Sequence, residues 1–95
     1  MNYDHLKSTA NAMVTKRKGI LAADESTPTC TKRFDSIGLE STELMRNIYR
    51  DMLFTTPKME EFISGVILYD ETLRQSTIED EIPIPQYLDN IGVIP

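Results

Sequence analysis

The sequence contains one cysteine, one histidine and no tryptophan. A single cysteine permits no internal disulfide, which favours a reducing compartment. One histidine without a cysteine cluster argues against a metal site. Basic residues are in the minority, with a net charge of −5, and this argues against broad electrostatic binding to nucleic acid or anionic lipid.

Long apolar segments are also lacking. No run approaches the roughly 20 apolar residues that span a bilayer, and the N-terminal residues have no apolar core of the kind found in signal peptides. We therefore expect a cytoplasmic protein that uses neither membrane nor nucleic acid as a partner and needs no metal or other cofactor. The 95 residues suffice for one small domain.

Helix and strand signals alternate along the first part of the chain. Apolar residues at helical spacing predict an amphipathic helix from residue 3 to about residue 16, which Gly19 ends. The apolar run 20–23 is typical of a buried parallel strand, although alone it also fits a helix fragment. The glycine before the run and the acidic pair after it favour the strand.

Two helical segments follow this strand. Residues 27–37 are compatible with a short helix that has Pro28 in its first turn and ends at Gly38. The clearest helix of the sequence comes next, with Ser41 or Thr42 as its cap. Its wide apolar face is expected to pack into the core and consists of Leu44, Met45, Ile48, Tyr49, Met52 and Leu53.

The remaining sequence repeats the alternation. Residues 66–69 form a second apolar run that ends at two acids, a short helix is expected near residues 85–88, and residues 93–94 look like the start of a third strand. This order predicts an α/β protein with a parallel sheet, either doubly wound or a (β/α)₈ barrel. The apolar last residues suggest a chain that stops within its fold.

Acidic residues stand at the end of both predicted strands, where α/β proteins gather their functional groups. A carboxylate at Asp24 can bind substrate hydroxyls or transfer protons, and it can equally serve as a helix cap. For Asp70 and Glu71 a turn or a salt bridge is the favoured interpretation. Cys30 has no nearby histidine and is expected to be a packed thiol.

Hydroxyl and basic side chains follow Asp24 closely. Ser26, Thr27, Thr29 and Thr31 can present hydroxyls to an anion, and Lys32 and Arg33 can add positive charge. A phosphate group is the anion that such a turn suits. The alternative is a solvated polar turn, and the glycine spacing of a Walker loop is missing.

Three stretches resemble the N-terminal part of the class I (Schiff-base) fructose-bisphosphate aldolases: "GILAADES", "ESTELMRNIYRDMLFTTP" and "ISGVILYDETLRQ". The resemblance covers essentially the whole chain. It implies the first strands and helices of a (β/α)₈ TIM barrel that cleaves fructose 1,6-bisphosphate into two triose phosphates through a lysine imine, without a metal. Members of this family are commonly cytoplasmic homotetramers.

The same resemblance assigns roles to individual residues. Asp24 matches a catalytic aspartate that contacts substrate hydroxyls near the bond that breaks. Glu25 and Lys32 match positions with supporting roles. The positions that match the phosphate-binding turn are Ser26, Thr29 and Arg33.

The sequence departs from the family pattern in three ways. Pro28 and Arg17 each stand where the family usually has glycine, and Cys30 stands where a small or aliphatic residue is usual. Residues 1–95 would be the N-terminal portion of one barrel domain, without the imine-forming lysine, so we expect this chain alone to be inactive and poorly folded. Alternatives are a short non-catalytic protein that binds sugar phosphates or an aldolase, and another barrel enzyme with the same first loop.

Overall fold

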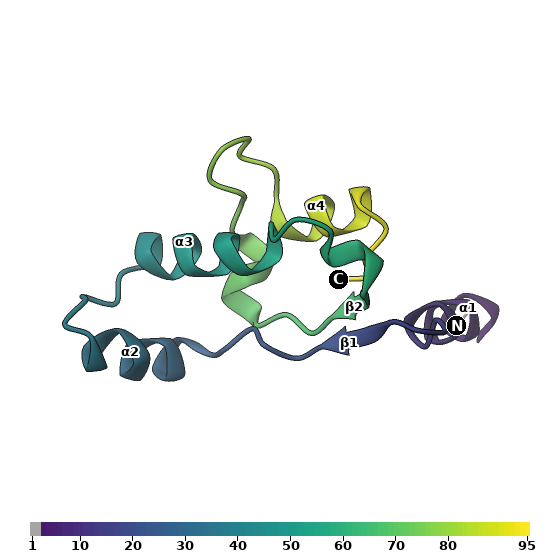
Figure 1. The fold of residues 1–95 in the computed structure, drawn as a ribbon, viewed down its shortest axis with the longest axis horizontal. Helices are drawn as coiled ribbons and strands as arrows, with labels where there is room; N and C mark the ends of the chain where they lie inside the picture. The colour runs from purple at the N-terminus through teal and green to yellow at the C-terminus, as the bar shows by residue number, and fades with distance from the viewer. Residues whose placement is uncertain (1–2) are drawn as a thin grey trace.

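The computed structural model describes residues 3–95. The molecule is elongated, 46 × 26 × 24 Å along its principal axes. Helices and strands follow one another in the predicted order, with two short 3₁₀ turns flanking the second strand (Figure 1). In chain order the elements are α1 (Tyr3–Met13), β1 (Gly19–Leu21), α2 (Thr27–Ser36), α3 (Glu43–Phe54), η1 (Met59–Glu61), β2 (Ile63–Val66), η2 (Asp70–Arg74) and α4 (Ile84–Asn90).

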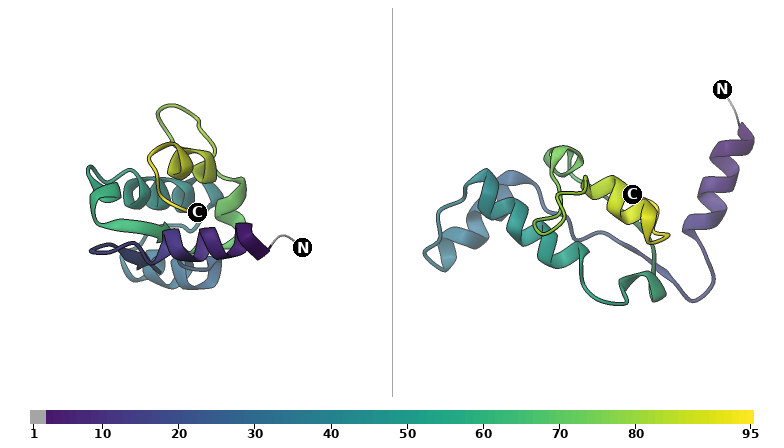
Figure 2. Two further views of the ribbon diagram at one scale, coloured as in Figure 1. Left: turned by 90° about the vertical axis from the view of Figure 1, so that its right-hand side faces the viewer. Right: turned by 90° about the horizontal axis from the view of Figure 1, so that it is seen from above.

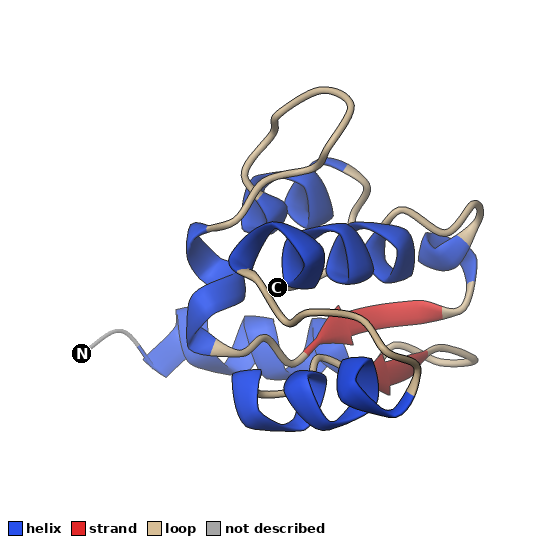
Figure 3. Ribbon diagram, turned by 90° about the vertical axis from the view of Figure 1, so that its left-hand side faces the viewer, coloured by secondary structure: helices blue, strands red, loops and turns tan. Residues whose placement is uncertain are grey.

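The two strands pair in parallel, with Ile20 opposite Gly65. The C-terminal residues add a third parallel segment on the other side of β2, where the Val66 N–H donates to the Ile94 carbonyl at 2.8 Å. The predicted parallel pairing and the start of a third strand are therefore confirmed. In Figure 3, α3 lies on one side of the strands and α2 on the other.

The predicted bounds of the elements needed correction. The first strand ends at Leu21 rather than residue 23, and the second spans Ile63–Val66 rather than residues 66–69. The Ile67 N–H still donates to the Leu21 carbonyl at 2.9 Å, but the Tyr69 N–H donates to the Asp24 carboxylate instead of to β1. A side chain thus replaces the backbone ladder at the strand ends.

Local signals at the helix ends were more reliable. The Thr42 hydroxyl caps α3 by accepting from the Met45 N–H at 3.1 Å, and Pro28 lies in the first turn of α2. Gly38 follows α2 with a φ of 74°, a left-handed conformation that glycine adopts without strain. Arg17, in the turn between α1 and β1, has a φ of 69° without that freedom.

The core lies between the strands, α4 and the C-terminal end of α3. Its buried apolar members are Phe54, Met59, Val66, Ile84, Leu88 and Val93. Helix α1 projects from one end of the molecule and none of its residues is buried (Figure 2). Its contact with the sheet is made by Met13, whose carbonyl accepts from the Ser64 hydroxyl.

The apolar face of α3 is where the sequence interpretation was wrong. Leu44, Ile48 and Met52 are exposed by 63%, 41% and 62%, whereas Arg50 on another face is buried. The helix instead turns Arg46 and Arg50 towards the acids at the strand ends, where Arg50 pairs with the enclosed carboxylate of Asp24, which would be costly to bury alone. Leu53 does pack against the core as expected.

Candidate functional site

The carboxylate of Asp24 lies just beyond the end of β1 and is fully enclosed, with 0% of its side chain exposed. One oxygen accepts from Arg50 Nε at 3.0 Å and the other from the Tyr69 backbone N–H at 2.7 Å. Asp24 therefore ties the end of β1 to α3 and to the segment after β2. Contact with a ligand requires the carboxylate or one of these partners to move.

Arg50 is the centre of this cluster and is only 1% exposed. Besides Asp24, its guanidinium donates to the Glu71 carboxylate at 2.6 Å, to the Gln75 side-chain oxygen at 3.0 Å and to the Glu25 carbonyl at 2.9 Å. It also lies over the Tyr69 ring, 5.7 Å from the centroid. Our sequence interpretation missed Arg50. One sequence signal could have indicated it. Two arginines, at positions 46 and 50, are spaced i,i+4 and therefore share one face of the helix, outside its apolar stripe.

Glu71 receives two arginines at the same strand ends. Arg46 Nε donates to it at 2.8 Å, and Arg50 adds the second cation. The hydrogen bond from Arg46, followed by that from Arg50, lowers the pKa of Glu71 from 4.5 to about 2. Asp70 pairs with Arg74 at 2.7 Å on the surface. The salt-bridge interpretation of both acids is confirmed.

The hydroxyl-rich turn joins Asp24 to α2. The hydroxyls of Ser26 and Thr29 lie 3.1 Å apart at the start of the helix, so these two predicted phosphate-binding groups are brought together. Thr31 points elsewhere and donates to the Ser41 hydroxyl at 2.8 Å. Ser26 precedes α2 without making a side-chain cap bond, which leaves its hydroxyl able to bond to a ligand.

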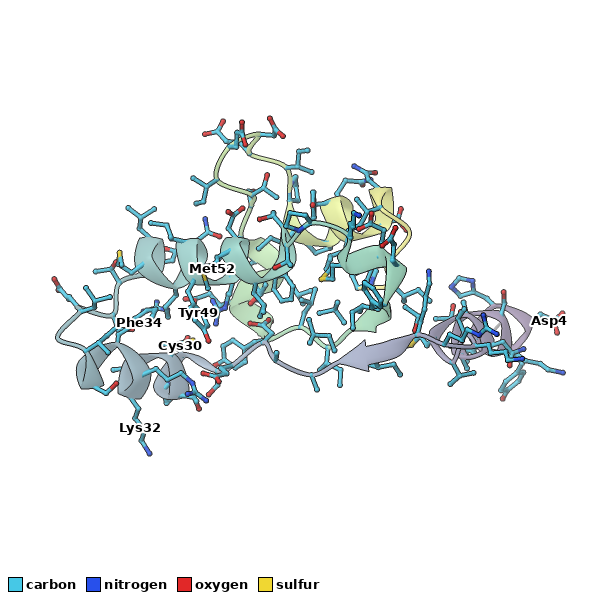
Figure 4. The ribbon with its side chains drawn as sticks, in the orientation of Figure 1. Asp4, Cys30, Lys32, Phe34, Tyr49 and Met52 are labelled. Carbon is cyan, nitrogen blue, oxygen red and sulfur yellow. The ribbon has the colours of Figure 1, made fainter. Side chains whose placement is uncertain are left out.

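The basic residues of this region diverge. Arg33 donates to the Glu25 carboxylate at 2.6 Å, and this hydrogen bond raises the pKa of the arginine, whose side chain remains 60% exposed. Lys32 extends from the opposite side of α2, away from α3 (Figure 4). In this arrangement Arg33 is held by Glu25, while Lys32 points into solvent.

Cys30 is packed beneath the same turn. Its thiol is 1% exposed and donates to the Glu25 carbonyl at 3.6 Å. Burial raises the pKa of the thiol, which keeps it protonated and unreactive. The packed-thiol interpretation is confirmed. Pro28 costs α2 no hydrogen bond, because N–H groups in a first helical turn have no intrahelical acceptor.

The described residues 3–95 contain no group of three or more His, Cys, Asp or Glu side chains placed to hold a metal ion. Within the same range, no helix has the length and apolar character needed to cross a membrane. An apolar groove of about 270 Å³ lies between α2 and α3, and Phe34 and Tyr49 meet there edge to face at 5.8 Å.

Parallel strands whose ends carry paired acids and hydroxyls are the arrangement of α/β enzymes, which place their sites at that edge. Residues 5–95 match the family model of the glycolytic class I fructose-bisphosphate aldolases. The chain belongs to this family.

Named relatives agree with that assignment. The chain is 50% identical over its whole length to a probable class 1 fructose-bisphosphate aldolase of Xanthomonas campestris, and 52% identical over 93 residues to fructose-bisphosphate aldolase 1 of Caenorhabditis elegans. Among solved structures, it is similar to a fructose-bisphosphate aldolase of Plasmodium falciparum, crystallised with TRAP and a small-molecule inhibitor.

That structural match has a TM-score of 0.86 and 50% identity, and it covers 97% of this chain and 26% of the Plasmodium chain. The chain spans 28% of the Xanthomonas relative and 25% of the Caenorhabditis relative. The family is therefore shown over a segment about a quarter as long as these relatives.

Proposed function

We propose that this chain forms the first part of a (β/α)₈ barrel that cleaves fructose 1,6-bisphosphate reversibly into dihydroxyacetone phosphate and glyceraldehyde 3-phosphate. A lysine outside these 95 residues would form the imine with the substrate ketone and act as the electron sink for carbon–carbon cleavage. We further propose that the complete protein is a cytoplasmic homotetramer that acts in glycolysis and gluconeogenesis, as the family resemblance implies.

The observation that carries this proposal is the position of Asp24. Its carboxylate lies at the carboxyl end of the first strand of a parallel sheet, directly before a hydroxyl-bearing helix start, in a chain of this family. In the proposed reaction one oxygen of Asp24 turns to the substrate hydroxyls beside the breaking bond and assists the proton transfers there. Arg50 retains the other oxygen.

The phosphate would bind at the start of α2. Ser26 and Thr29 already lie together there, and their hydroxyls suit phosphate oxygens. Arg33 would leave Glu25 to join them. That exchange is inexpensive, because an exposed ion pair contributes about 0–1 kcal/mol and an arginine fork binds phosphate in two places. Glu25 and Lys32 would have supporting roles.

A chimera tests the proposal. This chain replaces the matching N-terminal segment of the Xanthomonas campestris relative, and cleavage of fructose 1,6-bisphosphate is measured together with borohydride trapping of the dihydroxyacetone phosphate imine. We expect turnover and trapping in the chimera, and neither in the isolated 95-residue chain. Asp24→Asn in the chimera should lower kcat about 100-fold or more, in the range for a lost acid–base group.

Two results would contradict the proposal. Turnover by the isolated chain would show that no outside lysine is needed. A chimera that folds and binds the sugar phosphate without cleaving it would favour the non-catalytic binding protein instead.

A further inference from the structure

Arg50 has more partners than the proposed chemistry requires. Its guanidinium reaches four groups from two separate segments: Asp24 and Glu25 after β1, and Glu71 and Gln75 in and directly after η2. The sequence separations are 21 to 26 residues, so these contacts depend on the tertiary fold. Arg50 and Asp24, which are paired with each other, both join the end of β1 to the segment after β2 through a charged group.

The shape of the guanidinium makes this junction specific. Arginine presents its N–H donors in a rigid planar fork, and here Nε, Nη1 and Nη2 each point to a different acceptor. Lysine offers a point charge on a flexible stem and cannot satisfy the same acceptors together. Tyr69 covers one face of the fork and limits its rotation.

Two of these contacts fall on consecutive residues. Nε holds the Asp24 carboxylate and Nη2 holds the Glu25 carbonyl, so the side chain of one residue and the backbone of the next are fixed together. The turn that begins there leads straight to Ser26 and Thr29. A change at Arg50 therefore alters both the direction of the carboxylate and the path of the turn.

We infer that Arg50 is a positioning residue for the aldol cleavage, which acts by holding one oxygen of Asp24 and the following turn in place while the other oxygen of Asp24 turns to the substrate. This inference rests on the proposed function. Arg50 is 1% exposed, and in this proposal it acts through Asp24 rather than on the substrate. Its effect is on carbon–carbon cleavage, because Asp24 serves that step, and not on formation of the lysine imine.

The expected loss of kcat on replacing Arg50 follows from how strongly catalysis depends on the placement of reacting groups. Loss of a side chain that orients a reacting group typically costs 10–100-fold, and a displacement of about 1 Å can cost 100-fold. We expect Arg50→Gln in the chimera to lower kcat about 10–100-fold per competent site, and to raise KM by a smaller factor because the turn that carries Ser26 and Thr29 also shifts. Arg50→Lys should recover part of the loss, about threefold, because it returns the charge without the fork.

Borohydride trapping with dihydroxyacetone phosphate counts the imine-competent sites in each preparation, and kcat is divided by that count. A merely structural role would reduce the number of sites and leave kcat per site unchanged. Arg46→Gln is the matched control, because it removes an arginine from the same helix that donates to Glu71 and Ser41 rather than to Asp24. It should lower thermal stability and keep kcat per site within about threefold.

The outcomes separate the two proposals. An inactive parent chimera defeats the proposed function itself. If the parent is active and Arg50→Gln has the same kcat per imine-competent site as the parent, the positioning role is wrong while the proposed function stands. Full recovery by Arg50→Lys would also overturn the inference, because charge alone would then be sufficient.

Discussion

Replacing Glu71 by glutamine removes the one carboxylate that two arginines share at the strand ends. Arg46 and Arg50 hold the pKa of Glu71 at about 2, against an ordinary 4.5. Since the folded pKa is the lower one, the unfolded chain takes up the proton first as the pH falls. The stabilisation by ionised Glu71 is thus complete above pH 4.5 and is lost progressively down to about pH 2.

The magnitude follows from the two pKa values. At pH 7 the difference corresponds to at most about 3 kcal/mol. About 0.8 kcal/mol of this is lost by pH 4 and about 1.4 kcal/mol by pH 3.5. Since 24% of the Glu71 side chain is exposed, solvent screening makes these values upper limits.

Urea unfolding of the chimera, followed by far-UV circular dichroism at pH 7, 4 and 3.5, measures the effect. The stability difference between the parent and Glu71→Gln should be largest at pH 7 and should shrink as the pH falls. Asp70→Asn, which breaks an exposed pair with Arg74, is the control and should change stability by less than about 0.5 kcal/mol. A Glu71→Gln difference that stays constant with pH would refute this account of the ion pair.

Two further stability changes follow from the fold. Arg17→Gly should raise the free energy of unfolding by about 1 kcal/mol, because glycine adopts the φ of 69° without strain. Arg17→Ala should bring no such gain. Urea denaturation curves in which the alanine variant is more stable than the glycine variant would contradict this. Leu88→Ala should cost about 2–5 kcal/mol because Leu88 is fully buried in the core. Leu44→Ala, on the exposed face of α3, should cost less than about 0.5 kcal/mol by the same assay, and equal losses for the two leucines would show that Leu44 is packed after all.

Local sequence signals predicted the elements well. The helix that Thr42 caps and the proline-started helix α2 were expected from neighbouring residues, and the parallel pairing of the two short strands from the alternation of helices and strands. Such signals depend on interactions within a few residues, which the sequence order itself contains. The end of the second strand was predicted too late because the Tyr69 N–H bonds to a side chain 45 residues away.

The predicted site was found in part. The sequence pointed to Asp24, to the Ser26 and Thr29 hydroxyls and to the acids after β2, and the structure gathers Asp24 and Glu71 around one cation. It did not point to Arg50, because an arginine within an amphipathic helix normally marks the solvated face. Arg33, expected at a phosphate, is held by Glu25 in this structure.

The sequence by itself determined the family, the alternation of helices and strands, and the acidic and hydroxyl residues at the strand ends. The tertiary structure decided which face of α3 is buried and which partner each charge receives. The physical reason is that hydrophobic periodicity depends only on the residues of the helix itself, whereas the face that is buried also depends on the groups that pack against it. The enclosed carboxylate of Asp24 would be costly to bury unpaired, and its partner Arg50 reaches it only in the folded chain.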